Sequence, residues 1–287
     1  MLLAMRFFFK SAVIGALALL VLAGTKPALA QYQGPIFDAH LHYNWEPKPY
    51  YNVEQVLEIF KRNNIKGILA TSRPNVGTVA LVEAKQSDVW VVPFIRQYKT
   101  RADIPTWFND PSIYEMVLEE YKRGYYRGVG EFHIYGKAAA SEYAAKLVRF
   151  AVEKDLYIHA HCDEQALEIL FSHDKGARII WAHTGFSTSP ADLKALFKKY
   201  PTLMGELSFR GGITDSSGNL TPEWRELFTT HSDRFLLGTD TWITERWFQY
   251  DNLIKNYRNW LGQLPKEHAD KIAFGNAERL FRSEKKQ

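Results

Sequence analysis

The chain has 287 residues, enough for one large domain or two small ones with a substantial hydrophobic core. Lys and Arg total 36 against 32 Asp and Glu, and no run of basic residues suggests nucleic acid as a partner. Cys162 is the only cysteine, which excludes an intrachain disulfide. We interpret it as a small packing residue and not as a nucleophile.

The first thirty residues have the pattern of a secretory signal peptide. Arg6 and Lys10 precede or open an apolar run over residues 11–23 that is too short to span a bilayer, and Ala28-Leu29-Ala30 is a cleavage signature before Gln31. An uncleaved anchor is the alternative. No later run is long and apolar enough to span a membrane. We therefore expect a secreted, periplasmic protein with no stable membrane association after cleavage.

From residue 31 onward, short apolar runs alternate with amphipathic runs of helical periodicity. Strands are expected at residues 36–42, 65–71, 89–96, 126–134, 156–161, 178–183, 203–209 and 235–240. Helices are expected at residues 52–63, 76–86, 110–123, 138–154, 163–173, 189–199, 222–231, 250–261 and 265–281. This alternation predicts an α/β protein, a single-domain (β/α)8 TIM barrel over residues 31–287, with an open doubly wound sheet as the rival architecture.

The first strand ends in two histidines, within Asp38-Ala39-His40-Leu41-His42. Residues two apart in a strand point to the same face, so Asp38, His40 and His42 share one side. Neutral imidazole is a good ligand for Zn²⁺ and other divalent metals, and the pair is a candidate metal site.

Ionisable residues recur at the ends of the other expected strands, and with His40 and His42 six of the nine histidines lie at strand ends. The residues at the other strands are Glu131 and His133 in the fourth strand, His159 and His161 in the fifth, His183 in the sixth and Asp240 in the eighth. Burial of such groups in a barrel is costly without partners. A shared metal ion would resolve that cost.

Together these segments resemble the amidohydrolase superfamily of metal-dependent barrel enzymes, in the branch that contains hydrolases and some decarboxylases. The matching segments are residues 38–42, Gly130-Glu131, residues 158–161, residues 180–185, residues 237–240 and the closing helix at residues 275–281. The resemblance covers essentially all of residues 31–287.

The resemblance implies a role for each strand-end residue. His40 and His42 would bind the metal, His161 would be the ligand of the fifth strand, and His159 would be a deeper partner or the alternative ligand. His183 would bind a second metal or orient the substrate. Asp240 would bind the metal and take a proton from the attacking water.

Several further residues keep two interpretations. Glu131 is a ligand that bridges two metals, or a buried glutamate paired with an arginine or histidine. Arg96 holds a substrate carboxylate or phosphate, or forms a salt bridge with Glu131 or Glu206. Glu206 contacts the substrate or orients a ligand histidine. Lesser candidates for the pocket are His133, Ser208, Arg210, Trp45, Trp107 and Trp242.

The resemblance therefore implies a metal-dependent hydrolase with one or two divalent ions, most simply Zn²⁺. In such an enzyme, metal-bound hydroxide attacks the carbonyl of an amide, ester or lactone in a small-molecule substrate. The alternatives are a metal-dependent non-oxidative decarboxylase, for which Arg96 would be the substrate group, and a catalytically degenerate binding barrel. Neither the substrate nor the oligomeric state can be predicted from the sequence.

Overall fold

The computed structural model describes residues 31–46, 48–84 and 88–282. The predicted signal peptide over residues 1–30 lies outside these residues. Among the helices that the structure describes, none is both long and apolar enough to cross a membrane.

Eight parallel strands follow one another in chain order, each hydrogen-bonded to the next. They are β1 (Ile36–Leu41), β2 (Ile65–Ala70), β3 (Trp90–Ile95), β4 (Gly128–Ile134), β5 (Tyr157–Cys162), β6 (Ile179–Trp181), β7 (Met204–Glu206) and β8 (Phe235–Leu236). Two backbone bonds join β1 to the segment that continues β8: the amide of Ala39 donates to the carbonyl of Leu237 over 2.7 Å, and that of Asp240 to the carbonyl of His40 over 2.6 Å. The sheet thus closes on itself. The predicted (β/α)8 barrel is confirmed, since a doubly wound sheet would not place its strands in chain order.

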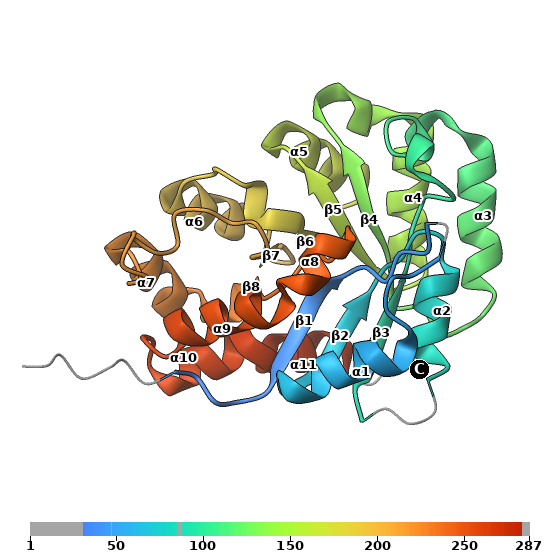
Figure 1. Ribbon diagram of the computed structural model, residues 1–287. Coiled ribbons are helices and arrows are strands. Elements are labelled where there is room, and N and C mark those ends of the chain that lie inside the picture. The colour runs from blue at the N-terminus through green and yellow to red at the C-terminus, as the bar shows by residue number, and fades with distance from the viewer. Residues whose placement is uncertain (1–30, 47, 85–87, 283–287) are drawn as a thin grey trace, which may run out of the picture.

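Helices surround the ring of strands (Figure 1). They are α1 (Val53–Arg62), α2 (Val76–Val82), α3 (Pro111–Tyr121), α4 (Glu142–Glu153), α5 (Glu164–His173), α6 (Pro190–Lys199), α7 (Pro222–Thr230), α8 (Thr244–Phe248), α9 (Tyr250–Leu261), α10 (Lys266–Asp270) and α11 (Asn276–Phe281). Local signals set several of their starts. The Asp163 carboxylate caps α5 by accepting the amide of Ala166 over 2.7 Å, and prolines occupy the first turns of α3 and α6.

Strands β6, β7 and β8 are shorter than predicted, because the backbone turns left-handed soon after each one. His183 has a φ of 58°, Phe209 of 51° and Asp240 of 48°. Residues with side chains rarely adopt this conformation, and a strand cannot continue through it. The turns lie at the carboxyl end of the barrel, where His183 and Asp240 face the interior.

Three predicted helices also differ from the structure. The helix expected at 138–154 is divided at Ser141, which caps α4, with the short 3-10 helix η3 (Gly136–Ala140) before it. The helix expected at 265–281 is α10, a π-helical turn η6 (Lys271–Gly275) and α11. The helix expected at 76–86 ends at Val82. Helix α8, in a loop rich in aromatic residues, was not predicted, because five residues carry too little periodicity.

The two ends of the barrel interior differ in polarity. At the amino ends of the strands, a buried apolar cluster that includes Phe37, Phe94 and Met204 packs against Phe281 of α11 and closes the barrel. One layer above, the buried Asp38 carboxylate accepts hydrogen bonds from the Thr239 hydroxyl (2.6 Å) and the Tyr250 hydroxyl (2.8 Å). Asp38 is thus a satisfied structural group that ties β1 to β8, and the open carboxyl end is left for the site.

Candidate metal centre

Six ionisable side chains gather inside the carboxyl end of the barrel: His40, His42, Glu131, His161, His183 and Asp240. All are at most 6% exposed except His161, whose side chain is 14% exposed. In three sets of residues drawn from this group and His133, one nitrogen or oxygen ligand atom of each residue lies within 4.8 Å of the others. These sets are His40–His183–Asp240, His40–His42–Glu131 and Glu131–His133–His161. Donor sets of this size and composition suit a transition-metal ion.

Glu131 lies at the centre of the cluster, and its two oxygens face different histidines. Its Oε2 is 3.5 Å from His40 Nε2 and 3.4 Å from His42 Nε2. Its Oε1 is 2.8 Å from His161 Nδ1 and 3.8 Å from His183 Nε2. The carboxylate thus connects the two halves of the site.

Asp240 closes the cluster from the β8 side. Its Oδ1 lies 3.1 Å from His42 Nε2 and 3.5 Å from His40 Nε2, while Oδ2 lies 3.9 Å from His183 Nε2. Although these are ion-pair distances, the buried Oδ1 receives no hydrogen bond. A buried carboxylate oxygen without a donor is costly, and a bound cation would compensate it.

Three of the histidines are held by oxygen atoms behind them. His40 Nδ1 lies 2.8 Å from Glu206 Oε2, His183 Nδ1 lies 2.9 Å from the Ser208 carbonyl, and His42 Nδ1 contacts the Thr71 carbonyl. A carbonyl or carboxylate can only accept, so each Nδ1 carries the proton. Each Nε2 then faces the centre of the site, which is how metal-binding histidines are oriented.

Arg96 lies beside the same cluster. Its Nη2 pairs with Glu131 Oε2 at 3.1 Å. Its Nη1 is 2.8 Å from His42 Nδ1 and 3.1 Å from His42 Nε2. Because Nη1 of Arg96 lies near both ring nitrogens of His42, it does not point along the lone pair of either one. We therefore assign the Nδ1 proton of His42 to a hydrogen bond with the Thr71 carbonyl. Of the two interpretations of Arg96, the salt bridge with Glu131 is the one observed.

The electrostatics of the cluster favour positive charge. Burial opposes protonation of His40, but Asp240, Glu131 and Glu206 outweigh it and raise its pKa well above the ordinary value. Burial would likewise raise the pKa of Asp240, yet His40 and His42 hold it at about 2. The carboxylates are therefore ionised and favour positive charge at the centre of the cluster.

His159, expected as a deeper partner or alternative ligand, and Glu206, expected to contact the substrate or orient a histidine, both lie outside the substrate pocket. Both are fully buried, and neither lines the pocket above the cluster. The ring of His159 lies 4.4 Å from that of His40, and its two nitrogens have no hydrogen-bond partner. Burial and the charge of His40 lower its pKa well below the ordinary value, so its ring is neutral. One of its nitrogens also lies within 4.8 Å of ligand atoms of His40 and Glu206, a further set that could hold an ion. Glu206 instead orients His40, which is the other role considered for it.

Of the lesser candidates for the pocket, some line it and others lie elsewhere in the protein. Trp242 and His133 line the pocket, and burial lowers the pKa of His133 to about 3. Trp107 is buried and donates to the His133 carbonyl over 2.8 Å. Arg210 lies over the ring of Trp224, away from the cluster. The buried Cys162 has a pKa raised by burial, consistent with a packing residue.

Two residues that the sequence did not single out complete the site. The Thr71 carbonyl holds His42, and the Thr71 hydroxyl accepts a hydrogen bond from the backbone amide of Glu131 over 3.0 Å. Arg73, on the next loop, is buried at the pocket wall and pairs with Glu46. Thr71 is the last residue of the expected strand at 65–71. Because strand-end position identified the histidines, the same criterion could have identified Thr71.

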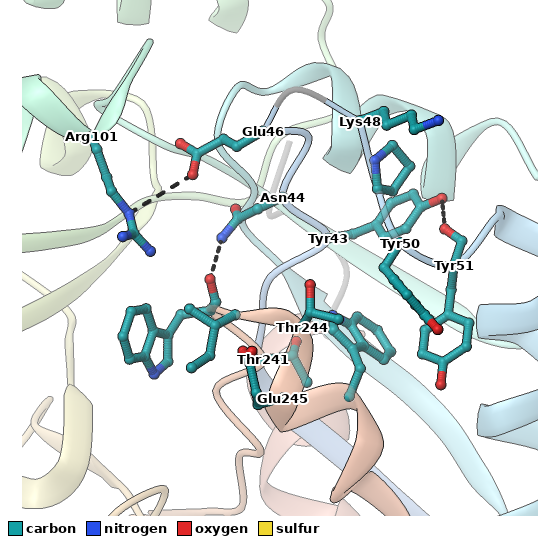
Figure 2. A pocket seen from close by; sticks show the side chains of 14 residues that line it. Tyr43, Asn44, Glu46, Lys48, Tyr50, Tyr51, Arg101, Thr241, Thr244 and Glu245 are labelled. Carbon is teal, nitrogen blue, oxygen red and sulfur yellow. Dashed lines mark hydrogen bonds and ion pairs between the residues drawn. The ribbon is translucent and has the colours of Figure 1, made fainter.

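A pocket of about 610 Å³ opens above the cluster. It is lined by Arg73, Arg96, Arg101, Ile104, Pro105, Glu131, His133, His161, His183, Phe186, Phe209, Asp240 and Trp242. A smaller pocket of about 200 Å³ adjoins it and shares Arg101 and Trp242 (Figure 2). Between the two, the guanidinium of Arg101 lies 5.4 Å from the ring of Trp242. The ionisable cluster therefore lies at the floor of a cavity large enough for a small molecule.

Residues 79–283 match the family model described as Amidohydrolase, which is more than half of the chain, and the protein belongs to this family. The match begins after His40 and His42, so those two ligand candidates depend on the geometry alone.

Solved structures share the fold at low sequence identity. An amidohydrolase from Burkholderia multivorans with bound zinc is 14% identical, with a TM-score of 0.57 and coverage of 88% of this chain and 100% of that one. A putative 2-pyrone-4,6-dicarboxylic acid hydrolase from Pseudomonas putida is 12% identical (TM-score 0.59; 87% and 98% covered). A TatD homolog from Escherichia coli K12 is 17% identical (TM-score 0.59; 87% and 98% covered). No curated protein matches the sequence.

Replacement of Glu206 tests the arrangement without removal of a ligand candidate. Glu206→Gln takes away the charge that accepts from His40 Nδ1, and we expect Zn²⁺ affinity to fall roughly 10- to 100-fold. The measurement is competition for Zn²⁺ against a chromophoric chelator. Glu226→Gln, at an exposed ion pair with Lys194, is the control and should bind as the wild type does. Equal affinity in Glu206→Gln and the wild type would contradict the assigned role.

Proposed function

We propose that this protein is a metal-dependent hydrolase that cleaves the acyl bond of a small amide, ester or lactone. The observation that carries the proposal is the excess of electron-pair donors at the pocket floor. His40 and His42 bring their Nε2 atoms within 3.1 Å of each other, with the carboxylates of Glu131 and Asp240 beside them. With both Nδ1 protons directed elsewhere, a bound metal cation would satisfy these atoms together.

The donor atoms fit divalent ions in two positions that share Glu131. His40, His42, Glu131 and Asp240 would hold one ion, and Glu131, His161 and His183 would hold the other. Imidazole nitrogen and carboxylate oxygen suit Zn²⁺, which is also bound in the relative from Burkholderia multivorans. When bound, such an ion lowers the pKa of a water ligand to about 7 and polarises a carbonyl.

Asp240 is the proposed general base. Its Oδ1 faces His40 and His42, whereas its Oδ2 is directed to the side of His183, and the residue lines the pocket. The water oxygen bonds to the carbonyl carbon, and the water proton passes to the Asp240 carboxylate. The same proton then goes to the leaving nitrogen or oxygen as the acyl bond breaks, so the carboxylate is regenerated.

Arg96 favours hydrolysis over decarboxylation. A decarboxylase would need a guanidinium at the centre free to hold the substrate carboxylate. Here Nη2 of Arg96 already pairs with Glu131 at 3.1 Å and Nη1 lies against His42. The presence of a carboxylate in the position of Asp240 also supports catalysis over a binding barrel.

The Asp240→Asn variant tests the role of Asp240 as general base, because it removes the carboxylate and keeps the shape of the side chain. We expect hydrolysis to fall about 10²- to 10⁴-fold, because the amide cannot take the proton. The measurement is turnover of a panel of aryl esters, lactones and N-acyl amides by Zn²⁺-, Mn²⁺- or Ni²⁺-loaded protein, with bound metal quantified in each sample. Asp251→Asn, at a surface pair with Arg62, is the control. Turnover of no panel member by any loaded wild-type protein, or an undiminished rate in Asp240→Asn at equal metal content, would overturn the proposal.

The proposed place of action is the periplasm, on the strength of the signal pattern over residues 1–30. Expression of the full chain in a Gram-negative host, with fractionation and N-terminal sequencing, tests this. We expect a periplasmic product that begins at Gln31. An intact N-terminus in the cytoplasmic fraction would show that the segment is not a signal peptide.

A further inference from the structure

The pocket above the cluster has two unlike walls. Arg73 follows β2, Arg96 follows β3, and Arg101 lies in the short 3-10 helix η1 (Arg101–Asp103) of the next loop. Phe186 follows β6, and Phe209 follows β7. One wall thus carries guanidinium groups and the other carries aromatic rings.

These walls lie on opposite sides of the barrel. The strands form a ring in chain order, so β2 and β3 are across the barrel from β6 and β7. The candidate ligands on β1, β4, β5 and β8 complete the ring between them. A carbonyl held over the cluster therefore has a cationic surface on one side and an apolar surface on the other.

The cationic wall has one guanidinium that is weakly engaged. Arg96 pairs with Glu131, and Arg73 is bound by Glu46 through two edges, with Nη2 to Oε2 at 2.8 Å. Arg101, by contrast, reaches the same Glu46 only at 3.8 Å, and its side chain is 57% exposed (Figure 2). Two arginines share one glutamate here, which leaves a net positive charge at the wall and Arg101 able to turn toward a ligand.

The aromatic wall exposes large apolar side chains at a cavity. Phe186 is 42% exposed and Phe209 is 47% exposed. Their ring centroids lie 4.4 Å and 5.7 Å from that of His183. Both residues have left-handed backbones, with φ of 56° and 51°, a conformation that is costly for a bulky residue and that concentrates at ligand sites. The wall presents a hydrophobic surface directly beside the reacting centre.

We propose that the substrate carries a carboxylate on one side of its scissile carbonyl and an apolar, ring-sized group on the other. Arg101 binds the carboxylate, supported by Arg73, which neutralises Glu46. Phe186 and Phe209 contact the apolar group. This inference rests on the proposed hydrolase function and names its substrate class.

Three matched compounds test the two walls separately. Hippurate (N-benzoylglycine) has a benzoyl group, an amide and a carboxylate; hippuramide lacks the charge; N-acetylglycine lacks the ring. We expect Zn²⁺-loaded wild-type protein to bind hippurate about tenfold more tightly than either of the others. The measurement is Kd by calorimetry, or KM for a compound that is hydrolysed.

Variants assign the preference to its residues. Arg101→Gln should weaken hippurate about tenfold and hippuramide less than twofold, and Arg101→Lys should restore part of the loss. Phe209→Ala should weaken hippurate and hippuramide alike but leave N-acetylglycine unchanged. Arg123→Gln and Phe248→Ala, exposed residues that do not line the pocket, are the matched controls.

The outcomes separate this inference from the proposed function. Equal binding of all three compounds, or a preference for hippurate that survives Arg101→Gln, would overturn it. If the selectivity appears as expected but no acyl compound is cleaved by the loaded protein, the hydrolase proposal fails and the ligand class stands.

Discussion

The position of one buried carboxylate, that of Glu131, sets the constraints on the rest of the site. Its two oxygens face His40 and His42 on one side and His161 and His183 on the other, and the residue is only 2% exposed. A buried anion must be compensated, and Arg96 supplies only one partner. His40, His42 and His183 direct their Nε2 atoms inward because oxygen atoms behind them hold their Nδ1 protons. The proposed bound cations would complete this arrangement.

The two ends of the barrel have different tasks: the amino ends of the strands stabilise the fold, and the carboxyl ends carry the candidate site. The amino ends of the strands are closed by an apolar cluster against α11. The Asp38 carboxylate accepts hydrogen bonds from the hydroxyls of Thr239 and Tyr250. The carboxyl ends carry the unsatisfied groups, and the chain turns left-handed at His183 and Asp240 to direct them into the interior. Backbone strain of about 1–3 kcal/mol per residue is tolerated there because the barrel below fixes the strand ends.

Periodicity and strand-end position were sufficient to predict the barrel and the residues gathered in its centre. They could not show where the strands end, because the turns at His183 and Asp240 depend on tertiary packing and not on local propensity. The two interpretations of Arg96 and of Glu206 required geometry, since a charged residue inside a barrel has the same sequence signal whether it meets substrate or orients a neighbour. Arg101 was not identified, because a loop residue carries no periodic signal.

The most direct test of the account is the metal content of the protein. Residues 31–287 would be loaded with Zn²⁺, dialysed and analysed for metal, beside a His40→Ala, His42→Ala double variant whose folding is checked by circular dichroism. The two donor sets that share Glu131 predict about two equivalents of Zn²⁺ per chain in the wild type, and loss of at least one in the double variant. A folded wild-type protein that binds no transition metal after reconstitution, or a double variant that retains its full complement, would contradict the account.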